Sequence, residues 1–193
     1  MRAPNCLCAS FFAVSLSSSA WALPMVQIAR PVTDHHSAAT LASDTADYIR
    51  NAAIGDMFAI AAARVAQKKS HNYDVQRFAQ MAIDDNRAFA DALTLTLKQA
   101  EFAMTLPALL DTEHAQLVKQ LEATPQSDFD ASYMQQQIMA HQSALRVHAS
   151  YAKNGRDQSL RQYAGQAIPK IRLQLTLAER IFEKISPKTA ALR

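Results

Sequence analysis

Apolar side chains recur every three or four residues along most of this chain, and that spacing predicts long amphipathic helices. Only three glycines occur in 193 residues, and β-branched residues are rarely clustered, so the composition also favours helix over strand. We therefore expect an all-α protein. The predicted helices span residues 44–69, 73–100, 112–123, 129–154 and 158–185.

Polar, glycine and proline residues mark the helix ends. Asn72, Asp128 and Asp157 stand where N-caps are expected, because their side-chain oxygens can accept hydrogen bonds from the first free N–H groups of a helix. Gly155 follows the fourth segment as its C-terminal stop.

Pro169 lies inside the last predicted helix, four residues after Gly165. A proline ring clashes with the carbonyl four residues earlier, so this pair predicts a kink rather than a break. We expect a leucine side chain at position 165 to crowd the kink.

Four helices of similar length make a four-helix bundle the expected architecture. The short breaks at residues 70–72 and 155–157 require two antiparallel helix hairpins. Between the hairpins, residues 101–128 are long enough to run back along the bundle, with a short extra helix inside this connection. Such a crossover is ferritin-like, although length alone also permits a simple up-down order.

Residues 1–22 have the pattern of a cleavable signal peptide. Arg2 precedes a run of apolar and small residues, and the triplet Ala20-Trp21-Ala22 has the small residues that a cleavage site needs. A membrane anchor is the alternative, but five serines dilute a run that is short for a bilayer span. We expect cleavage near Ala22, a periplasmic or secreted protein, and no transmembrane segment in the mature chain.

The rest of the chain divides into three parts. Residues 23–43 contain two prolines and no sustained period, which predicts a flexible N-terminal arm. Residues 44–186 form the helical domain, and residues 187–193 form a C-terminal tail. Removing the signal peptide removes one of 20 basic residues and none of 17 acidic ones, so the mature chain is nearly neutral. Nucleic-acid binding, which needs a basic stripe, is not expected.

The chain offers little for catalysis. Both cysteines, Cys6 and Cys8, lie in the predicted signal peptide, so the mature chain has no thiol chemistry. Glycine-rich phosphate loops and recognisable serine nucleophile motifs are absent from the sequence. We expect no cofactor and no enzymatic activity.

Three polar residues interrupt the inward-facing stripes near the middle of their helices: Asp85, His141 and Gln174. If these helices pack side by side, the three lie at one level. We expect a buried hydrogen-bond network that sets the helix register, because buried polar groups need partners. A metal site is the alternative, with Asp85 and His141 as weak candidate ligands.

A metal at this level would lack ligands. An open catalytic zinc site uses three protein ligands, whereas residues 57–61 of the first helix are all apolar. The Glu-x-x-His pairs of ferritin-like carboxylate sites do not occur in the chain. We therefore expect no metal here. His114 and His148 are interpreted as partly buried or surface histidines, and the adjacent His35 and His36 as solvent-exposed.

Residues 44–183 resemble a bacterial family catalogued as domain of unknown function 4142, whose members are exported and have a ferritin-like helical fold. The resemblance rests on the order and spacing of short matches. They are Phe78-Ala79-Gln80-Met81 with Asp84, Leu106-Pro107, Phe129-Asp130 with Tyr133, His141 with Ala144-Leu145, and Ile168-Pro169.

The resemblance also implies a Glu near Ala59 or Ala61 and histidines at the positions of Asp85 and Gln174, so three candidate ligands are replaced in this chain. It supports fold and export but implies no reaction. We expect a non-enzymatic periplasmic protein that acts in envelope maintenance or stress through its surface, on an unknown envelope protein or by self-association. The alternative is a ferritin-like metal-binding or oxidative-stress protein with a degenerate metal site.

Overall fold

The computed structural model describes residues 35–186, and for residues 35–43 it describes the backbone alone. Regular structure in this range is helical throughout, so the all-α prediction is confirmed. The predicted signal peptide, most of the predicted arm, the tail 187–193 and the side chains of His35 and His36 lie outside what is described. The helices are α1 (His35–Lys69), α2 (Tyr73–Gln99), α3 (Thr112–Ala123), α4 (Gln126–Asn154) and α5 (Gln158–Ile185).

Two helices begin earlier than predicted. α1 begins at His35, nine residues before Asp44, so the last part of the predicted arm is helical. Alanine and leucine between residues 38 and 42 favour this extension. α4 begins at Gln126, three residues before the predicted start, because Pro125 already has a φ of −56° and leads directly into the first turn. Asp128 therefore lies inside that turn instead of capping it.

The other caps follow the sequence. The Asn72 side chain accepts hydrogen bonds from the first N–H groups of α2. Asp157 accepts the Leu160 N–H at 2.8 Å, and Asp111 accepts the His114 N–H at the same distance. Each carboxylate or amide satisfies donors that a helix start leaves free, so α2, α3 and α5 begin where the sequence predicts.

Gly155 ends α4 for a reason that the sequence did not indicate. Its φ is −60°, an ordinary conformation, so it is not the left-handed glycine of a typical helix stop. A Cβ at this position would lie 2.5 Å from a ring carbon of Tyr151 and 2.6 Å from the Tyr151 backbone oxygen. The glycine is required by this close approach.

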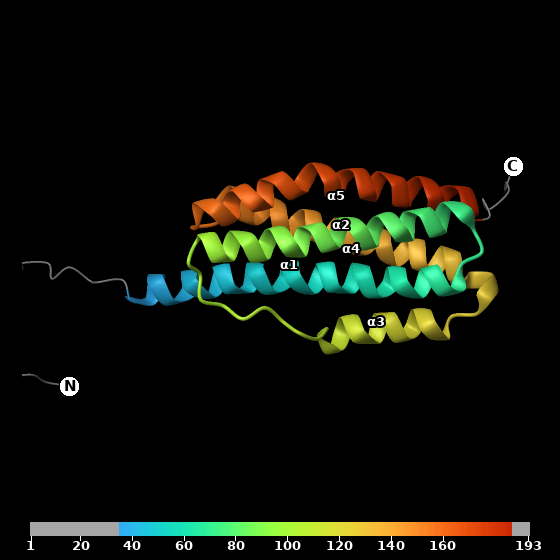
Figure 1. Cartoon of the computed structure of the whole chain (residues 1–193), viewed down its shortest axis with the longest axis horizontal. Helices are drawn as coiled ribbons and strands as arrows, with labels where there is room; N and C mark the ends of the chain where they lie inside the picture. Colours follow the sequence, from blue (N-terminus) through green and yellow to red (C-terminus); the bar gives the residue numbers. More distant parts are fainter. Residues whose placement is uncertain (1–34, 187–193) are drawn as a thin grey trace, which may run out of the picture. The chain divides into compact units, whose positions relative to one another are not determined.

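The prediction that a side chain at position 165 would be crowded is wrong. Pro169 does lie inside α5, which bends over the other helices in Figure 1. Gly165, however, is exposed, and a Cβ built on it meets no atom within 4 Å. A side chain at position 165 would extend into solvent.

These two glycines make a matched pair for a test of stability. We expect Gly155→Ala to lower the free energy of unfolding by about 1–3 kcal/mol, because the methyl group overlaps Tyr151. We expect Gly165→Ala to raise it by up to about 1 kcal/mol, because alanine is the better helix former in open space. Urea unfolding of both variants measures the difference, and equal stabilities would contradict the argument.

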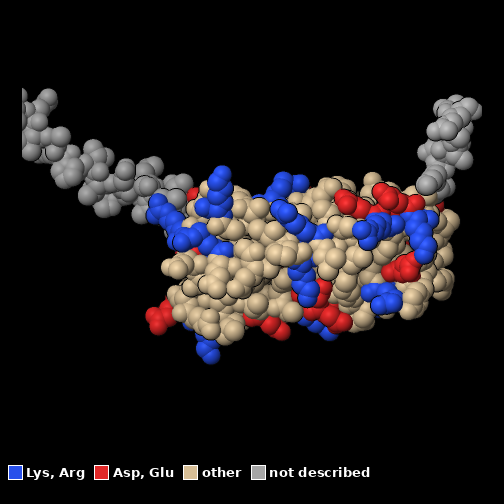
Figure 2. Space-filling model, turned by 90° about the horizontal axis from the view of Figure 1, so that it is seen from above, with Lys and Arg blue, Asp and Glu red and all other residues tan. Residues whose placement is uncertain are grey.

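The four long helices lie side by side (Figure 1). α1 packs against α2 and α4, α5 packs against α2 and α4, and the short α3 lies along α1. Basic and acidic side chains share the face shown in Figure 2, as expected from the nearly neutral composition. Within residues 35–186, no helix combines the length and the hydropathy that a membrane crossing requires.

The connection between α2 and α4 is a crossover. The Gln126 side chain, at the start of α4, donates to the Lys69 carbonyl at the end of α1, 2.8 Å away. The Lys69 ammonium in turn donates to carbonyl oxygens at the end of α3, those of Glu122 and Thr124, each at 2.7 Å. Since α2 also starts beside the end of α1, α2 and α4 start at the same end, and the chain between them returns along the molecule (Figure 1). The simple up-down order is excluded.

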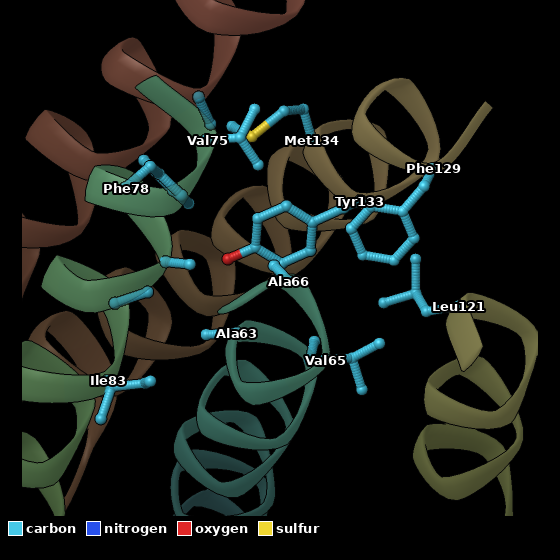
Figure 3. Packing of buried hydrophobic residues seen from close by; sticks show 14 of the residues in the cluster. Ala63, Val65, Ala66, Val75, Phe78, Ile83, Leu121, Phe129, Tyr133 and Met134 are labelled. Atoms are coloured by element: carbon cyan, nitrogen blue, oxygen red, sulfur yellow. The ribbon is translucent and has the colours of Figure 1, made fainter. Parts of the chain in front are cut away.

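Two hydrophobic clusters fill the interior. One contains Phe78, Leu121, Phe129 and Tyr133, and the rings of Phe129 and Tyr133 stack with their centroids 6.3 Å apart (Figure 3). The other lies around Tyr48 and includes residues of α2, α4 and α5. Each long helix contributes residues to both clusters, and between these residues it places polar side chains in the interior. These polar side chains form the candidate site.

Candidate functional site

The three polar residues predicted at mid-bundle come together in the structure. Gln174 of α5 donates its side-chain N–H to Asp85 Oδ2 of α2 at 2.9 Å. Its Oε1 lies 3.1 Å from His141 Nε2 of α4. Gln174 and His141 are only 1% and 4% exposed, so this network links three helices inside the protein.

Gln174 is the bridge of the network. Asp85 and His141 each bond to it, and neither needs to reach the other. The second oxygen of Asp85 pairs with the Lys170 ammonium at 2.6 Å, a partner that the sequence analysis did not include. Lys170 lies one turn before Gln174 on α5, so one helix face supplies both partners of the carboxylate.

His141 lies between two hydrogen-bond acceptors. Its Nδ1 is 2.6 Å from the Gln137 carbonyl, and its Nε2 faces Gln174 Oε1 because the amide N–H of Gln174 points at Asp85. Satisfying both contacts would take a proton on each ring nitrogen. Burial instead lowers the pKa of His141, which favours the neutral ring with a single N–H.

A cavity of about 270 Å³ lies beside this network, with His141 and Gln174 in its wall. It exists because small residues face one another there, Ala52, Gly55 and Ala59 on α1 against Ala140 and Ala144 on α4. A Cβ built on Gly55 meets no atom within 4 Å, as expected beside an open space.

The open side of the cavity is marked by its exposed lining residues, Asn51 of α1 and Ser143 of α4. His114 of α3 also lines it, and its ring lies 5.2 Å from that of Phe58. The cavity is therefore bounded by residues of all five helices.

Asp56 of α1 is the polar residue of this wall that stands out. It is 6% exposed, and its Oδ2 has no hydrogen-bond partner among the described residues. An unpaired carboxylate is costly to bury, because its charge loses water and gains nothing. Burial accordingly raises the pKa of Asp56 well above its ordinary value.

Residues 57–61 of the first helix are apolar, as expected, but Asp56 lines the cavity with His141 and Gln174 and was not among the residues predicted there. The apolar segment considered in the sequence starts at Met57, one residue after Asp56. Asp56 follows Ala52 by four residues and precedes Ala59 by three, so it lies on the inward stripe of α1. This spacing was the signal that could have identified it.

The two remaining histidines differ in their burial. His148 is 4% exposed, and its Nδ1 lies 3.2 Å from the Tyr48 hydroxyl. Burial lowers the pKa of His148 to about 4, so its ring is neutral near pH 7. His114 is half-buried, and its Nδ1 lies 2.8 Å from Asp111 Oδ1. The interpretation of His148 as a partly buried or surface histidine is therefore wrong, because His148 is a buried residue of the cavity wall. His114 is partly buried, as interpreted from the sequence.

In a comparison with protein-family profiles, residues 30–181 match a domain of unknown function, DUF4142. This chain belongs to the DUF4142 family. The match includes every residue of the cavity and network, so the site lies inside the family domain. No curated protein and no solved structure is similar to the chain at a significant level.

The positions where the DUF4142 resemblance implies metal ligands are part of this region. Ala59 lines the cavity, while Asp85 and Gln174 form the network beside it. Among the residues whose side chains the structure describes, no three His, Cys, Asp or Glu are grouped closely enough to hold a metal ion. The absence of a bound metal remains a prediction, and the geometry gives no support to the metal-binding alternative.

Proposed function

We propose that this member of the DUF4142 family is an exported, non-enzymatic protein with a ferritin-like four-helix bundle, and that it binds a small organic molecule inside the bundle. The observation that carries the proposal is the cavity of about 270 Å³ with the unpartnered Asp56 in its wall. An apolar cavity of about 150 Å³ already binds benzene, so this one has room for a ring with a short polar arm.

The polar groups of the site support binding rather than catalysis. His141 contacts Gln137 and Gln174, and His148 contacts Tyr48. Neither imidazole contacts a serine or Asp56 among the described residues. The linked acid, base and nucleophile that covalent catalysis requires are therefore not assembled here.

A role in envelope maintenance or stress, as expected from the sequence, is retained within this proposal. The cavity suggests how the protein could fill that role, because a protein that binds a small molecule can carry or sequester it outside the cytoplasm.

Export itself is tested by intact-mass analysis. The mature protein should begin at Leu23, and a retained Met1 would contradict the signal-peptide assignment.

Binding is tested by filling the cavity. Gly55→Leu places a side chain into open space in the wall, and Gly165→Leu places the same side chain into solvent as the matched control. With benzyl alcohol as the probe, amide NMR shifts at Ala140, Ala144 and His148 should move in the wild type and in Gly165→Leu. They should stay unchanged in Gly55→Leu. Equal shifts in all three proteins would place the probe elsewhere and overturn the proposal.

A further inference from the structure

The cavity has an unbalanced set of charged groups. Among the described residues that line it, Asp56 is the one carboxylic acid, and there is no lysine or arginine. Lys170, a cation near the network, is already paired with Asp85. The described lining of the cavity therefore supplies no lysine or arginine as a counter-ion for Asp56.

From this arrangement we propose that the cavity binds small organic ammonium ions, with Asp56 as their counter-ion. This inference rests on the proposed function and names its ligand class. An ammonium would supply the N–H donor that Asp56 Oδ2 lacks, in a charge-assisted hydrogen bond.

Other features of the wall suit the same class of ligand. Phe58 and Phe89 line the cavity, and aromatic rings attract cations and pack against apolar groups. Asn86 donates its amide N–H to the Ala82 carbonyl at 2.7 Å. Its Oδ1 accepts no hydrogen bond from the described residues and remains available as a second acceptor for an ammonium group.

Binding should be linked to protons. Burial raises the pKa of Asp56, whereas a bound ammonium ion would stabilise its carboxylate, so binding is linked to loss of the Asp56 proton. Affinity should therefore fall as the pH is lowered and Asp56 holds its proton more firmly. His141 and His148 do not supply a competing cation near pH 7, because burial lowers the pKa of both imidazoles. The groups that face Asp56 or the cavity are Tyr48 of α1, His114 of α3, His141 and His148 of α4 and Tyr163 of α5, with Asp85 of α2 behind Gln174.

Calorimetric titration with two probes of equal size tests the inference. Benzylammonium and benzyl alcohol share the ring and the length and differ in charge. At pH 8 the wild type should bind benzylammonium about 10-fold or more tightly than the alcohol. In Asp56→Asn that preference should shrink to about 2-fold, while Asp91→Asn, which removes an exposed acid outside the cavity, should keep it. Repeating the wild-type benzylammonium titration at lower pH should show weaker binding.

The outcomes separate the two proposals. Equal affinity for both probes in the wild type, or an undiminished preference in Asp56→Asn, would overturn the ammonium inference and leave a cavity that binds neutral molecules. Failure of both probes to bind would overturn the ammonium inference together with the proposed function. Loss of both probes in Gly55→Leu, with Asp56 intact, would place the observed binding in this cavity.

Discussion

Replacing Gln174 by leucine should lower the free energy of unfolding by about 3 kcal/mol. Leucine is similar in size, so the loss comes mainly from hydrogen bonds. The change leaves His141 Nε2 and Asp85 Oδ2 without their partner, and each stranded buried group costs about 1–3 kcal/mol. The Asp85 side chain is 15% exposed and keeps Lys170, so its share is the smaller one.

The same substitution at Gln166 is the control for this prediction. Gln166 is exposed on the same helix, so Gln166→Leu should change stability by less than about 0.5 kcal/mol. His141→Leu combined with Gln174→Leu should cost less than the sum of the two single changes, because the second change removes a group that the first one stranded. Denaturant unfolding of the set measures this coupling. Strict additivity would mean that Gln174 does not bridge the network.

Acidification should destabilise the protein through His148 by about 3 kcal/mol. Burial moves the pKa of this imidazole from 6.5 to about 4, and each unit is worth about 1.4 kcal/mol. Between these two values the unfolded chain takes up a proton that the folded chain does not, so unfolding becomes easier as the pH falls. The contribution of His148 is fully present above pH 6.5 and is lost as the pH approaches 4.

A variant comparison isolates this contribution, because other groups titrate in the same range. Asp56 has a raised pKa in the folded state, so its effect has the opposite sign, and His141 adds an effect of the same sign as His148. The stability gap between the wild type and His148→Gln should therefore narrow by about 3 kcal/mol from pH 8 to pH 4. Tyr48→Phe keeps the titrating imidazole and should retain most of the acid slope. Parallel curves for the wild type and His148→Gln would contradict the assignment.

The helices could be predicted from the sequence where their signals are local. Asn72 and Asp157 cap the helices that they precede, and α3 spans the predicted residues 112–123. The start of α4 could not be read in this way, since Pro125 and Asp128 are both plausible starting residues. The crossover could not be read either, because it depends on contacts such as that between Lys69 and the end of α3, which no local pattern encodes.

The site was only partly predictable for a related reason. Asp85, His141 and Gln174 interrupt apolar stripes, and such an interruption is visible in the sequence. Asp56 lies in an alanine-rich stripe, and its Oδ2 has no hydrogen-bond partner among the described residues, so a search for paired groups does not find it. The cavity beside Asp56 forms because small residues on two helices face each other, so it can be identified only when the facing residues of both helices are known.

The division of the interior bears on how a ligand could enter. The cluster around Tyr48 contains ten buried residues, against fifteen in the cluster of Figure 3. Polar residues and the cavity separate the two clusters, so each cluster should unfold locally more independently than the parts of one continuous core would. The free energy of local opening at each end then depends on the packing of the cluster at that end. The smaller cluster should open first and more often. Brief local unfolding of the end that contains the Tyr48 cluster would expose the cavity to solvent. The rate of ligand exchange would then depend on the stability of that end as well as on the width of the opening beside Asn51.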